Sequence, residues 1–230
     1  LYNKAYRYFK YHSAPHLGKG DEFMSINTES MIRNILERVS RIGYVKPEDI
    51  PNIDLYMDQV TTFMEAQLAH SKRYTDDKIL TKTMINNYAK NNLLPSPEKK
   101  RYSKEHLLVL IFIYYFKSIL SINDIQTLLG PLTDKYFKAD DEMDLTAIYN
   151  EVFSMEKGQI ESLQKELLER YEIAQDTFAD APDEDRDFLK LFSFICLLSF
   201  DVYVKKMLIE QIIDDMRTSA EPEGKHNKKK

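Results

Sequence analysis

The segment TKTMINNYAKN carries amide and ammonium side chains at helical spacing. In a helix, Lys82, Asn86 and Lys90 lie four residues apart and form one ridge, with Thr83 and Asn87 beside it. Asparagine can form two hydrogen bonds with adenine, lysine reaches guanine or phosphate, and threonine contacts a base edge or the thymine methyl group. The chemistry that this face suggests is recognition of DNA in the major groove.

Positive charge is concentrated around the same segment. Residues 78–106 contain seven cations and two acids, a local charge of +5 in a chain whose formal net charge is −5. The cations are Lys78, Lys82, Lys90, Lys99, Lys100, Arg101 and Lys104. DNA carries about one negative charge per 1.7 Å of duplex, so a protein that contacts phosphates concentrates cations at its docking face. A cationic run alone is more often a solvated surface, but its position beside the amide-rich helix favours a DNA interface.

The flanking sequence predicts the elements that position these side chains. Thr81 is suited to cap a helix over residues 81–91, and Asn92 is suited to the left-handed position that follows a helix. LLPSPEKKRY is a turn or wing, and Ser103 caps the next helix, LLVLIFIYYF, which is apolar almost all round and therefore central to the core. Ser121 caps a short helix that we expect to stop at Gly130-Pro131.

The order of these elements resembles the MerR-type winged helix-turn-helix. The matching residues are Thr81, Tyr88, Leu93-Leu94-Pro95, Lys100, Tyr102-Ser103, Ser121, Asp124, Ile125, Leu128 and Leu129. Asn86 and Asn87 replace the arginine and first tyrosine of that family's recognition helix, and residues HSKRYTDDK replace its tight turn. NIDLYMDQVTTFME followed by LTKTMINNY is still more similar to an uncharacterised family of Gram-positive bacterial proteins, known as a domain of unknown function and presumed to be regulatory.

We therefore expect an all-α protein, with a winged helix-turn-helix (MerR-like) module and an additional C-terminal helical bundle. Six glycines and eight prolines leave little room for turns, and apolar residues recur at helical spacing over residues 28–42, 54–69 and 187–217. The expected organisation is a flexible basic arm (1–22), the winged domain (23–131), an acidic helical domain for dimerisation or regulation (132–219) and a disordered tail (220–230). One stripe in the acidic domain comprises Ile160, Leu163, Leu167, Tyr171, Ala174 and Phe178.

Catalytic and metal chemistry find little support in the sequence. It contains no glycine-rich phosphate loop, no Gly-x-Ser-x-Gly and no His-Glu-x-x-His, and the five histidines do not form a helical metal pair. His106 is expected to be structural or exposed. The single cysteine, Cys196, lies in the apolar run FSFICLLSF and is expected to be buried and inert. We expect a cytoplasmic protein that is not an enzyme, with no cofactor and no membrane span.

The resulting hypothesis is a DNA-binding transcriptional regulator. Helix 81–91 enters the major groove through Lys82, Thr83, Asn86, Asn87 and Lys90, and wing 95–102 contacts DNA through Lys99, Lys100, Arg101 and Tyr102. We expect Tyr88 and Tyr102 to support helix and wing more than to touch bases. A homodimer through the C-terminal helices would read a two-fold DNA site. The alternative is a non-catalytic protein-interaction scaffold that retains the winged-helix fold.

Overall fold

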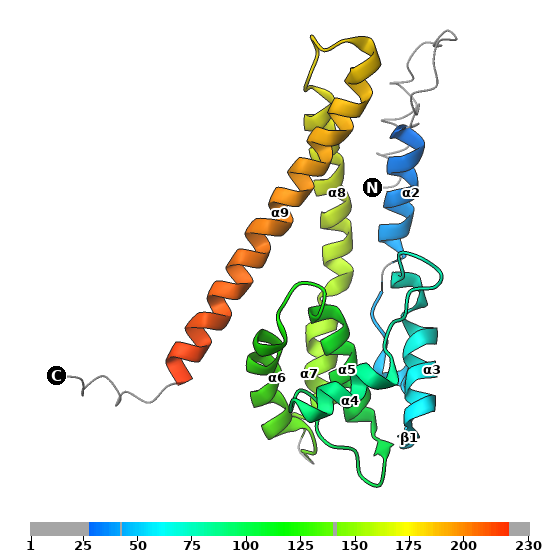
Figure 1. Cartoon of the computed structure of the whole chain (residues 1–230), viewed down its shortest axis with the longest axis vertical. Coiled ribbons are helices and arrows are strands. Elements are labelled where there is room, and N and C mark those ends of the chain that lie inside the picture. Colours follow the sequence, from blue (N-terminus) through cyan, green and yellow to red (C-terminus); the bar gives the residue numbers. More distant parts are fainter. Residues whose placement is uncertain (1–27, 42, 140–141, 221–230) are drawn as a thin grey trace, which may run out of the picture. The chain divides into compact units, whose positions relative to one another are not determined.

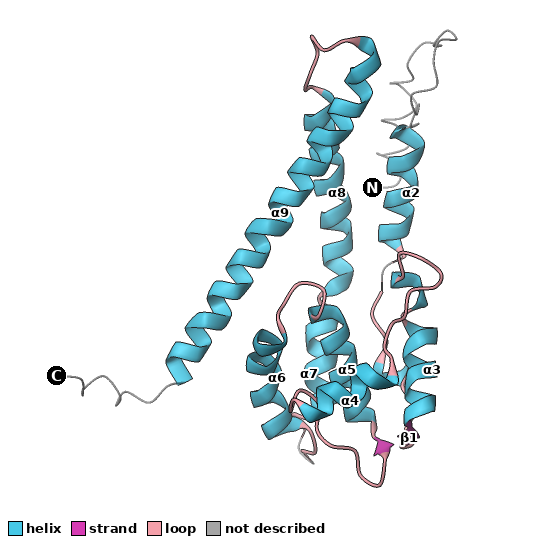
Figure 2. Ribbon diagram, in the orientation of Figure 1, coloured by secondary structure: helices cyan, strands magenta, loops and turns pink. Residues whose placement is uncertain are grey.

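The computed structural model describes residues 28–41, 43–139 and 142–220. The described chain is mostly helical, with two short strands (Figures 1 and 2). Its contacts define two compact units. Unit 1 contains the described parts of residues 1–43 and 155–203, and unit 2 contains those of residues 44–154 and 204–230. The predicted all-α class is confirmed, while the domain boundaries drawn from the sequence remain a prediction.

Unit 1 is built from three helical segments. They are α2 (Thr28–Ser40), α8 (Glu156–Gln175) and the first part of α9 (Asp183–Ala220). Ile32, Tyr171, Ala174 and Phe194 form its buried core, with Tyr171 and Phe194 packed edge to face. Gln164 on α8 donates a hydrogen bond to the Leu36 carbonyl oxygen of α2 (3.1 Å). The three segments are therefore held together by a small apolar core.

Unit 2 surrounds the apolar helix α5 (Lys104–Phe116), in which every residue from His106 to Ile113 is buried. This confirms the predicted central helix. Helix α7 (Leu145–Ser154) packs against α5, and the buried Tyr149 hydroxyl donates a hydrogen bond to the Val45 carbonyl oxygen (2.7 Å). Tyr149 also contacts Phe112 edge to face, so α7 closes one side of the core.

Helices α3 (Met57–Gln67) and α4 (Lys82–Lys90) pack on the same core through Val60, Met64 and Ile85. The loop between them contains the short 3-10 helix η2 (Ala69–Ser71), and a second one, η1 (Pro47–Asp49), precedes β1. The loop is tied to its surroundings by the Glu65 carboxylate, which accepts hydrogen bonds from Lys72 and from the Ile79 backbone N–H (3.4 Å). Lys117, directly after α5, donates to the Ile79 carbonyl oxygen (2.8 Å).

The ends of α4 have the geometry that the sequence predicts. The Thr81 side chain accepts a hydrogen bond from the Met84 backbone N–H (3.2 Å) and so caps the helix. Asn92 adopts a left-handed conformation with φ 55°. The Leu93 N–H then donates to the Tyr88 carbonyl oxygen (2.8 Å) and the Asn92 N–H to that of Ala89 (3.2 Å), the pattern of a Schellman motif.

The two strands were not predicted. β1 (Leu55–Tyr56) pairs antiparallel with β2 (Arg101–Tyr102), with Leu55 opposite Tyr102 and Tyr56 opposite Arg101 (Figure 2). Leu55 was expected inside the helix predicted for residues 54–69, but it belongs to β1, and that helix starts at Met57. The pairing ties the end of the predicted wing to the chain just before α3.

Helix α6 (Ile122–Tyr136) begins at the Ser121 cap as predicted, with Asp124 completing the capping box. The predicted stop at Gly130-Pro131 is wrong, because α6 continues through both residues. The missing proline N–H removes one hydrogen bond. Burial of Leu129 and Phe137 against the unit 2 core offsets this loss. The last part of α9 contributes the buried Ile213 to the same core.

Two other expectations about the C-terminal half are wrong. Cys196 is exposed. Phe194 and its neighbours on one side of α9 pack into the unit 1 core, and Cys196 lies on a different side of the helix. The stripe predicted for residues 160–178 holds for the buried Tyr171 and Ala174, but Leu163 and Phe178 are exposed. Phe178 lies beyond the end of α8 with φ 54°, so it does not continue the helical stripe.

Candidate nucleic-acid interface

The predicted DNA-reading face of α4 is exposed. Its five side chains, here called the α4 polar face, are Lys82, Thr83, Asn86, Asn87 and Lys90. The opposite side of the helix is anchored by the buried Ile85 and Tyr88. Apolar residues thus fix the rotation of α4 about its axis, and the amide and ammonium groups project into solvent.

The predicted wing has a tight turn at its tip, made by Glu98, Lys99, Lys100 and Arg101. Lys99 and Lys100 both have positive φ values, 48° and 64°, and the Arg101 N–H donates to the Glu98 carbonyl oxygen (2.8 Å). Two successive positive φ values across such a bond are typical of a type I′ hairpin turn, for which Asn-Gly is the preferred sequence. Here, two lysines occupy these positions. We call residues 98–101 the basic turn.

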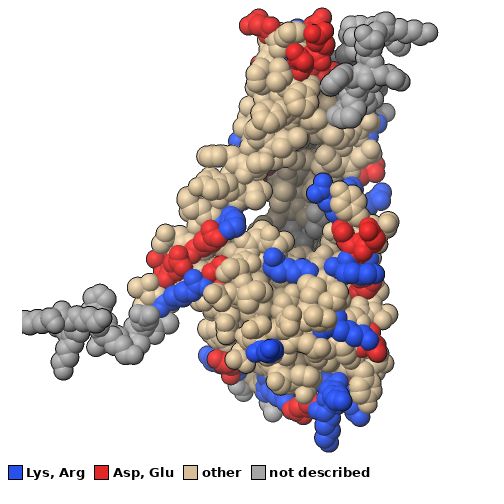
Figure 3. Space-filling view, in the orientation of Figure 1, with Lys and Arg blue, Asp and Glu red and all other residues tan. Residues whose placement is uncertain are grey.

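Left-handed backbone is unfavourable for lysine. It costs roughly 1–2 kcal/mol per residue because Cβ approaches the following carbonyl oxygen. Residues held in such conformations cluster at functional sites, where the surrounding structure fixes them. Lys99 and Lys100 are exposed, and neither has an ion pair with the described residues. Figure 3 shows Lys and Arg side chains gathered at the end of unit 2 where the loop between α4 and β2 lies.

The α4 polar face and the basic turn meet at the start of α3. Lys82 forms an ion pair with Asp58, which lies in the first turn of α3. The Arg101 guanidinium lies over the ring of Tyr56, 5.6 Å from its centroid, and Tyr56 is the residue before α3. The N-terminal end of α4 and the basic turn are therefore attached to neighbouring residues and belong to one surface of unit 2.

Tyr102 is not on this surface, although the sequence placed it among the DNA contacts. It is 3% exposed and its ring packs edge to face on His106 (5.5 Å between centroids). Burial raises the pKa of the Tyr102 hydroxyl. His106 in turn packs against Phe137 (4.7 Å). Tyr102 is thus the root of the wing, which matches the supporting role expected for it.

His106 is the buried polar residue beneath the wing. Its Nδ1 accepts a hydrogen bond from the Ser103 backbone N–H (2.9 Å), which completes the capping box at the N-terminus of α5. Its Nε2 has no hydrogen-bond partner among the described residues. Burial lowers the pKa of the imidazole below its usual 6.5, and the nearby Ser96 backbone opposes this shift only in part. Of the two roles expected for His106, the structural one is therefore correct.

Acidic groups partly neutralise the positive charge of this surface. Lys138, after α6, donates a hydrogen bond to Glu98 at the base of the basic turn, which lowers the pKa of Glu98 and raises that of Lys138. Asp58 partly neutralises Lys82. Lys90, Lys99, Lys100 and Arg101 have no ion pair to the described residues, so they are the cations most available to an anionic ligand.

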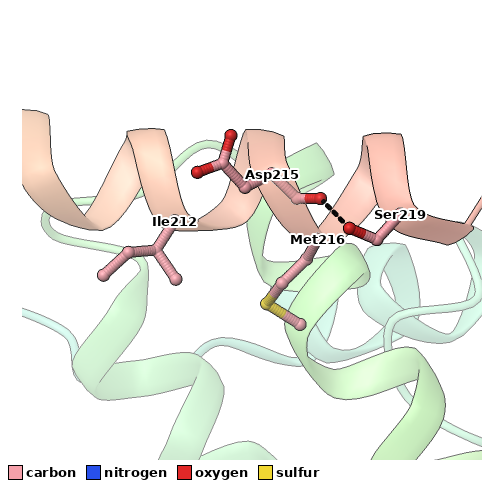
Figure 4. Close-up of a pocket in the computed structure, with 4 residues that line it drawn as sticks. All are labelled: Ile212, Asp215, Met216 and Ser219. Carbon is pink, nitrogen blue, oxygen red and sulfur yellow. Dashed lines mark hydrogen bonds between the residues drawn. The ribbon is translucent and has the colours of Figure 1, made fainter.

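Two surface hollows occur elsewhere in unit 2. One lies on α9 beside Ile212, Asp215, Met216 and Ser219 (Figure 4). Ile212 and Met216 point to one side of the helix and the Asp215 carboxylate to the other, while the Ser219 hydroxyl donates to the Asp215 carbonyl oxygen (2.8 Å). The second hollow is at the start of α6, where Arg217 binds Asp124 (2.6 Å). Neither hollow contains a histidine or a cysteine.

The sequence analysis missed the contribution of Tyr56 and Asp58. Both lie about 25 to 45 residues before the side chains that they contact, and no local pattern links them. Among the residues that the structure describes, no group of three or more His, Cys, Asp or Glu side chains could hold a metal ion. Within the same residues, every helix is too short or too polar to traverse a lipid bilayer.

Residues 45–152 match the model of a protein family described as a domain of unknown function (DUF1836). The matched segment nearly coincides with the continuous part of unit 2, residues 44–154, which includes the α4 polar face and the basic turn. No curated protein and no solved structure matches the chain. The expected similarity to an uncharacterised domain family is therefore confirmed for this segment, and no match to MerR-type proteins was found.

Proposed function

We propose that the protein is a sequence-specific DNA-binding transcriptional regulator with a winged helix-turn-helix of MerR-like type. In this proposal, α4 lies in the major groove and the wing, residues 95–102, grips the phosphate backbone. The protein acts as a homodimer that contacts a two-fold DNA site through one winged module per copy. It has no catalytic role.

The basic turn is the observation that carries the proposal. A solvated surface loop gains nothing from two lysines in left-handed backbone, and an Asn-Gly pair would make the same turn with less strain. Two adjacent ammonium groups at the tip of a hairpin do gain from a ligand that carries closely spaced negative charges. The phosphate backbone of DNA is such a ligand.

The α4 polar face supplies the second support. Asn86 and Asn87 are exposed in the middle of α4, where a helix in the major groove presents its side chains to base edges. The Asn side chain can donate to adenine N7 and accept from adenine N6 through one bidentate contact, and such a pair discriminates against the wrong base by about 1–3 kcal/mol. We assign sequence readout to these two residues and backbone contacts to the flanking Lys82 and Lys90.

Fluorescence anisotropy with DNA from upstream of the protein's own gene tests the proposal. If each of the five cations assigned to the DNA backbone neutralises one phosphate, the slope of log affinity against log salt is about −4.5 per copy. These cations are Lys82, Lys90, Lys99, Lys100 and Arg101. Replacing Lys99, Lys100 and Arg101 by alanine should make the slope shallower by about 2.7 per copy and weaken binding to every sequence. Asn86→Ala should weaken binding only to the preferred sequence.

The outcome that overturns this function is specific. If no binding to either the upstream DNA or a random duplex is seen at low salt, unit 2 does not bind DNA. The scaffold alternative would then apply, and the exposed side chains of α4 would be tested for contact with a protein partner. A salt-insensitive interaction that the triple substitution leaves unchanged would contradict the proposal equally.

A further inference from the structure

Helix α9 has a second apolar side that the described residues of unit 1 do not cover. Within the described residues of unit 1, Leu191, Phe194, Leu197 and Leu198 pack into the core of that unit. A different stripe of the same helix is exposed and recurs in alternating steps of four and three residues. Its members, here called the α9 seam, are Phe188, Phe192, Ile195, Ser199 and Val202. This 3.5-residue period is that of a coiled-coil contact.

The exposed apolar area on this side is large for a surface that stays in water. Phe188, Phe192, Ile195, Phe200, Val202 and Tyr203 are 52–66% exposed. At about 150–250 Å² for a whole aromatic side chain, the four apolar seam members together with the neighbouring Phe200 and Tyr203 offer roughly 600 Å² per chain. The largest apolar patch of a typical monomer is about 300–600 Å², and a stable interface buries about 800 Å² per partner. The exposed apolar area of the seam, together with the polar residues beside it, is therefore comparable to the area that one partner buries in a stable interface.

The charges that flank the seam indicate what covers it. On the N-terminal side of the seam, Glu184 and Asp185 are exposed in the first turn of α9. No charged residue lies between residues 191 and 200. On the C-terminal side of the seam, the same continuous helix carries Asp201, Lys205 and Lys206, and Lys206 forms an ion pair with Glu210. Residues 183–190 hold four acids and two cations, and residues 201–206 hold one acid and two cations. The seam thus has an end of net negative charge, a neutral apolar middle and an end of net positive charge.

We propose that a second copy of this chain covers the α9 seam, with the two α9 helices antiparallel. In that orientation the acidic end of each seam meets the basic end of the other, and the neutral middles pack together near residue 195. A parallel pair would instead place acid against acid and lysine against lysine. Isologous dimers use the same patch on both copies, and this patch is complementary to itself only when it is reversed.

This arrangement rests on the homodimer of the proposed function, but its test needs no DNA. Sedimentation of the full chain at about 10 µM should show a dimer if the seam is the contact. Phe192→Glu buries a carboxylate in the middle of the seam and should weaken the dimer at least tenfold. The matched control is Met143→Glu, at a similarly exposed apolar side chain of unit 2, which should leave the dimer intact.

Orientation is tested by charge reversal. Lys205→Glu with Lys206→Glu places acid against acid only in the antiparallel pair and should weaken it several-fold at low salt. Adding Glu184→Lys with Asp185→Lys in the same chain should restore the dimer. Circular dichroism with unchanged helix content excludes unfolding as the cause of any loss.

The exposed Cys196 adds a measurement on the wild-type chain, which has no other cysteine. Cys196 lies next to the midpoint of the seam, so a short bis-maleimide should join two copies through this thiol, and Phe192→Glu should abolish the cross-link. The proposal is overturned by a chain that sediments as a monomer, by a dimer that withstands Phe192→Glu, or by a failure to cross-link. A dimer that the lysine reversal does not weaken overturns the antiparallel orientation. Because no DNA is present in these experiments, a negative result would refute the α9 dimer without deciding whether unit 2 binds DNA.

Discussion

Lys99→Asn with Lys100→Gly is the substitution that best separates the two roles of the basic turn. It replaces two strained lysines by the pair that type I′ turns prefer, and it removes two charges from the tip. The reasoning about this turn therefore predicts opposite effects on folding and on DNA binding. The variant should be more stable than the wild type and should bind DNA more weakly.

The stability change follows from the backbone angles. With φ at 48° and 64°, each lysine carries a penalty of roughly 1–2 kcal/mol, which glycine lacks and asparagine carries in part. The greater freedom of glycine in the unfolded chain offsets about 0.5–1 kcal/mol of the gain. The net increase in the free energy of unfolding should be about 1–2 kcal/mol. For a chain of this length that corresponds to a rise in Tm of roughly 2–8 °C.

The loss in binding follows from counterion release. If each lysine neutralises one phosphate, the slope of log affinity against log salt becomes shallower by about 1.8 per copy. Between 50 and 200 mM salt, the difference in affinity between wild type and variant should consequently narrow by about tenfold. Urea denaturation and anisotropy titrations at the two salt concentrations measure both quantities on the same preparations.

A control must remove equal charge elsewhere. Lys165→Asn with Arg41→Asn does so at two exposed ion-paired residues of unit 1 and should leave the salt slope unchanged. If the Asn-Gly variant is destabilised, the left-handed lysines are not strained and the structural argument fails. If it is stabilised but binds DNA like the wild type, the basic turn does not contact phosphates, and the proposed function loses its main support.

Three further predictions concern the surface and the core beneath it. Asp58→Asn frees Lys82 and removes an acid from the proposed interface, so DNA affinity at low salt should rise about three- to tenfold in the same anisotropy assay. Tyr149→Phe leaves the buried Val45 carbonyl without its donor, and urea denaturation should show a loss of about 1–3 kcal/mol. The pKa of His106 is lowered in the folded state, so the unfolded chain binds the proton more readily and stability should fall as pH drops below about 6.5. His106→Gln, which keeps an acceptor for the Ser103 N–H, should flatten that pH dependence.

Local signals in the sequence predicted much of unit 2. Thr81, Asn92 and Ser121 each have a side chain or a backbone preference that acts within a few residues, and all three are found in the predicted cap positions. The run LLVLIFIYYF has no polar side and had to be buried. The exposure of the α4 polar face follows from the same logic, since the apolar residues of α4 occupy the other side.

The errors arose where distant contacts outweigh local preference. A Gly-Pro pair usually ends a helix, but α6 continues because Leu129 and Phe137 are buried on both sides of it. Cys196 lies in an apolar run, but α9 is apolar on two sides, and within the described part of the chain only the side with Phe194 is covered. The strand pairing of Tyr56 with Arg101 joins residues too far apart in the chain for any periodicity to reveal it.

The basic turn combines a strained tip with a rigid root, and each feature explains the other. Tyr102 is buried against His106, and the pairing of β1 with β2 fixes the backbone up to Arg101. A loop without such a root would let Lys99 and Lys100 relax to negative φ, because nothing would hold them in the less favourable conformation. The core of unit 2 therefore maintains the strain, and the result is that Lys99 and Lys100 project from a turn whose backbone is held in place. In the proposed function, this root would let the phosphate contacts of the basic turn set the register in which Asn86 and Asn87 meet the bases.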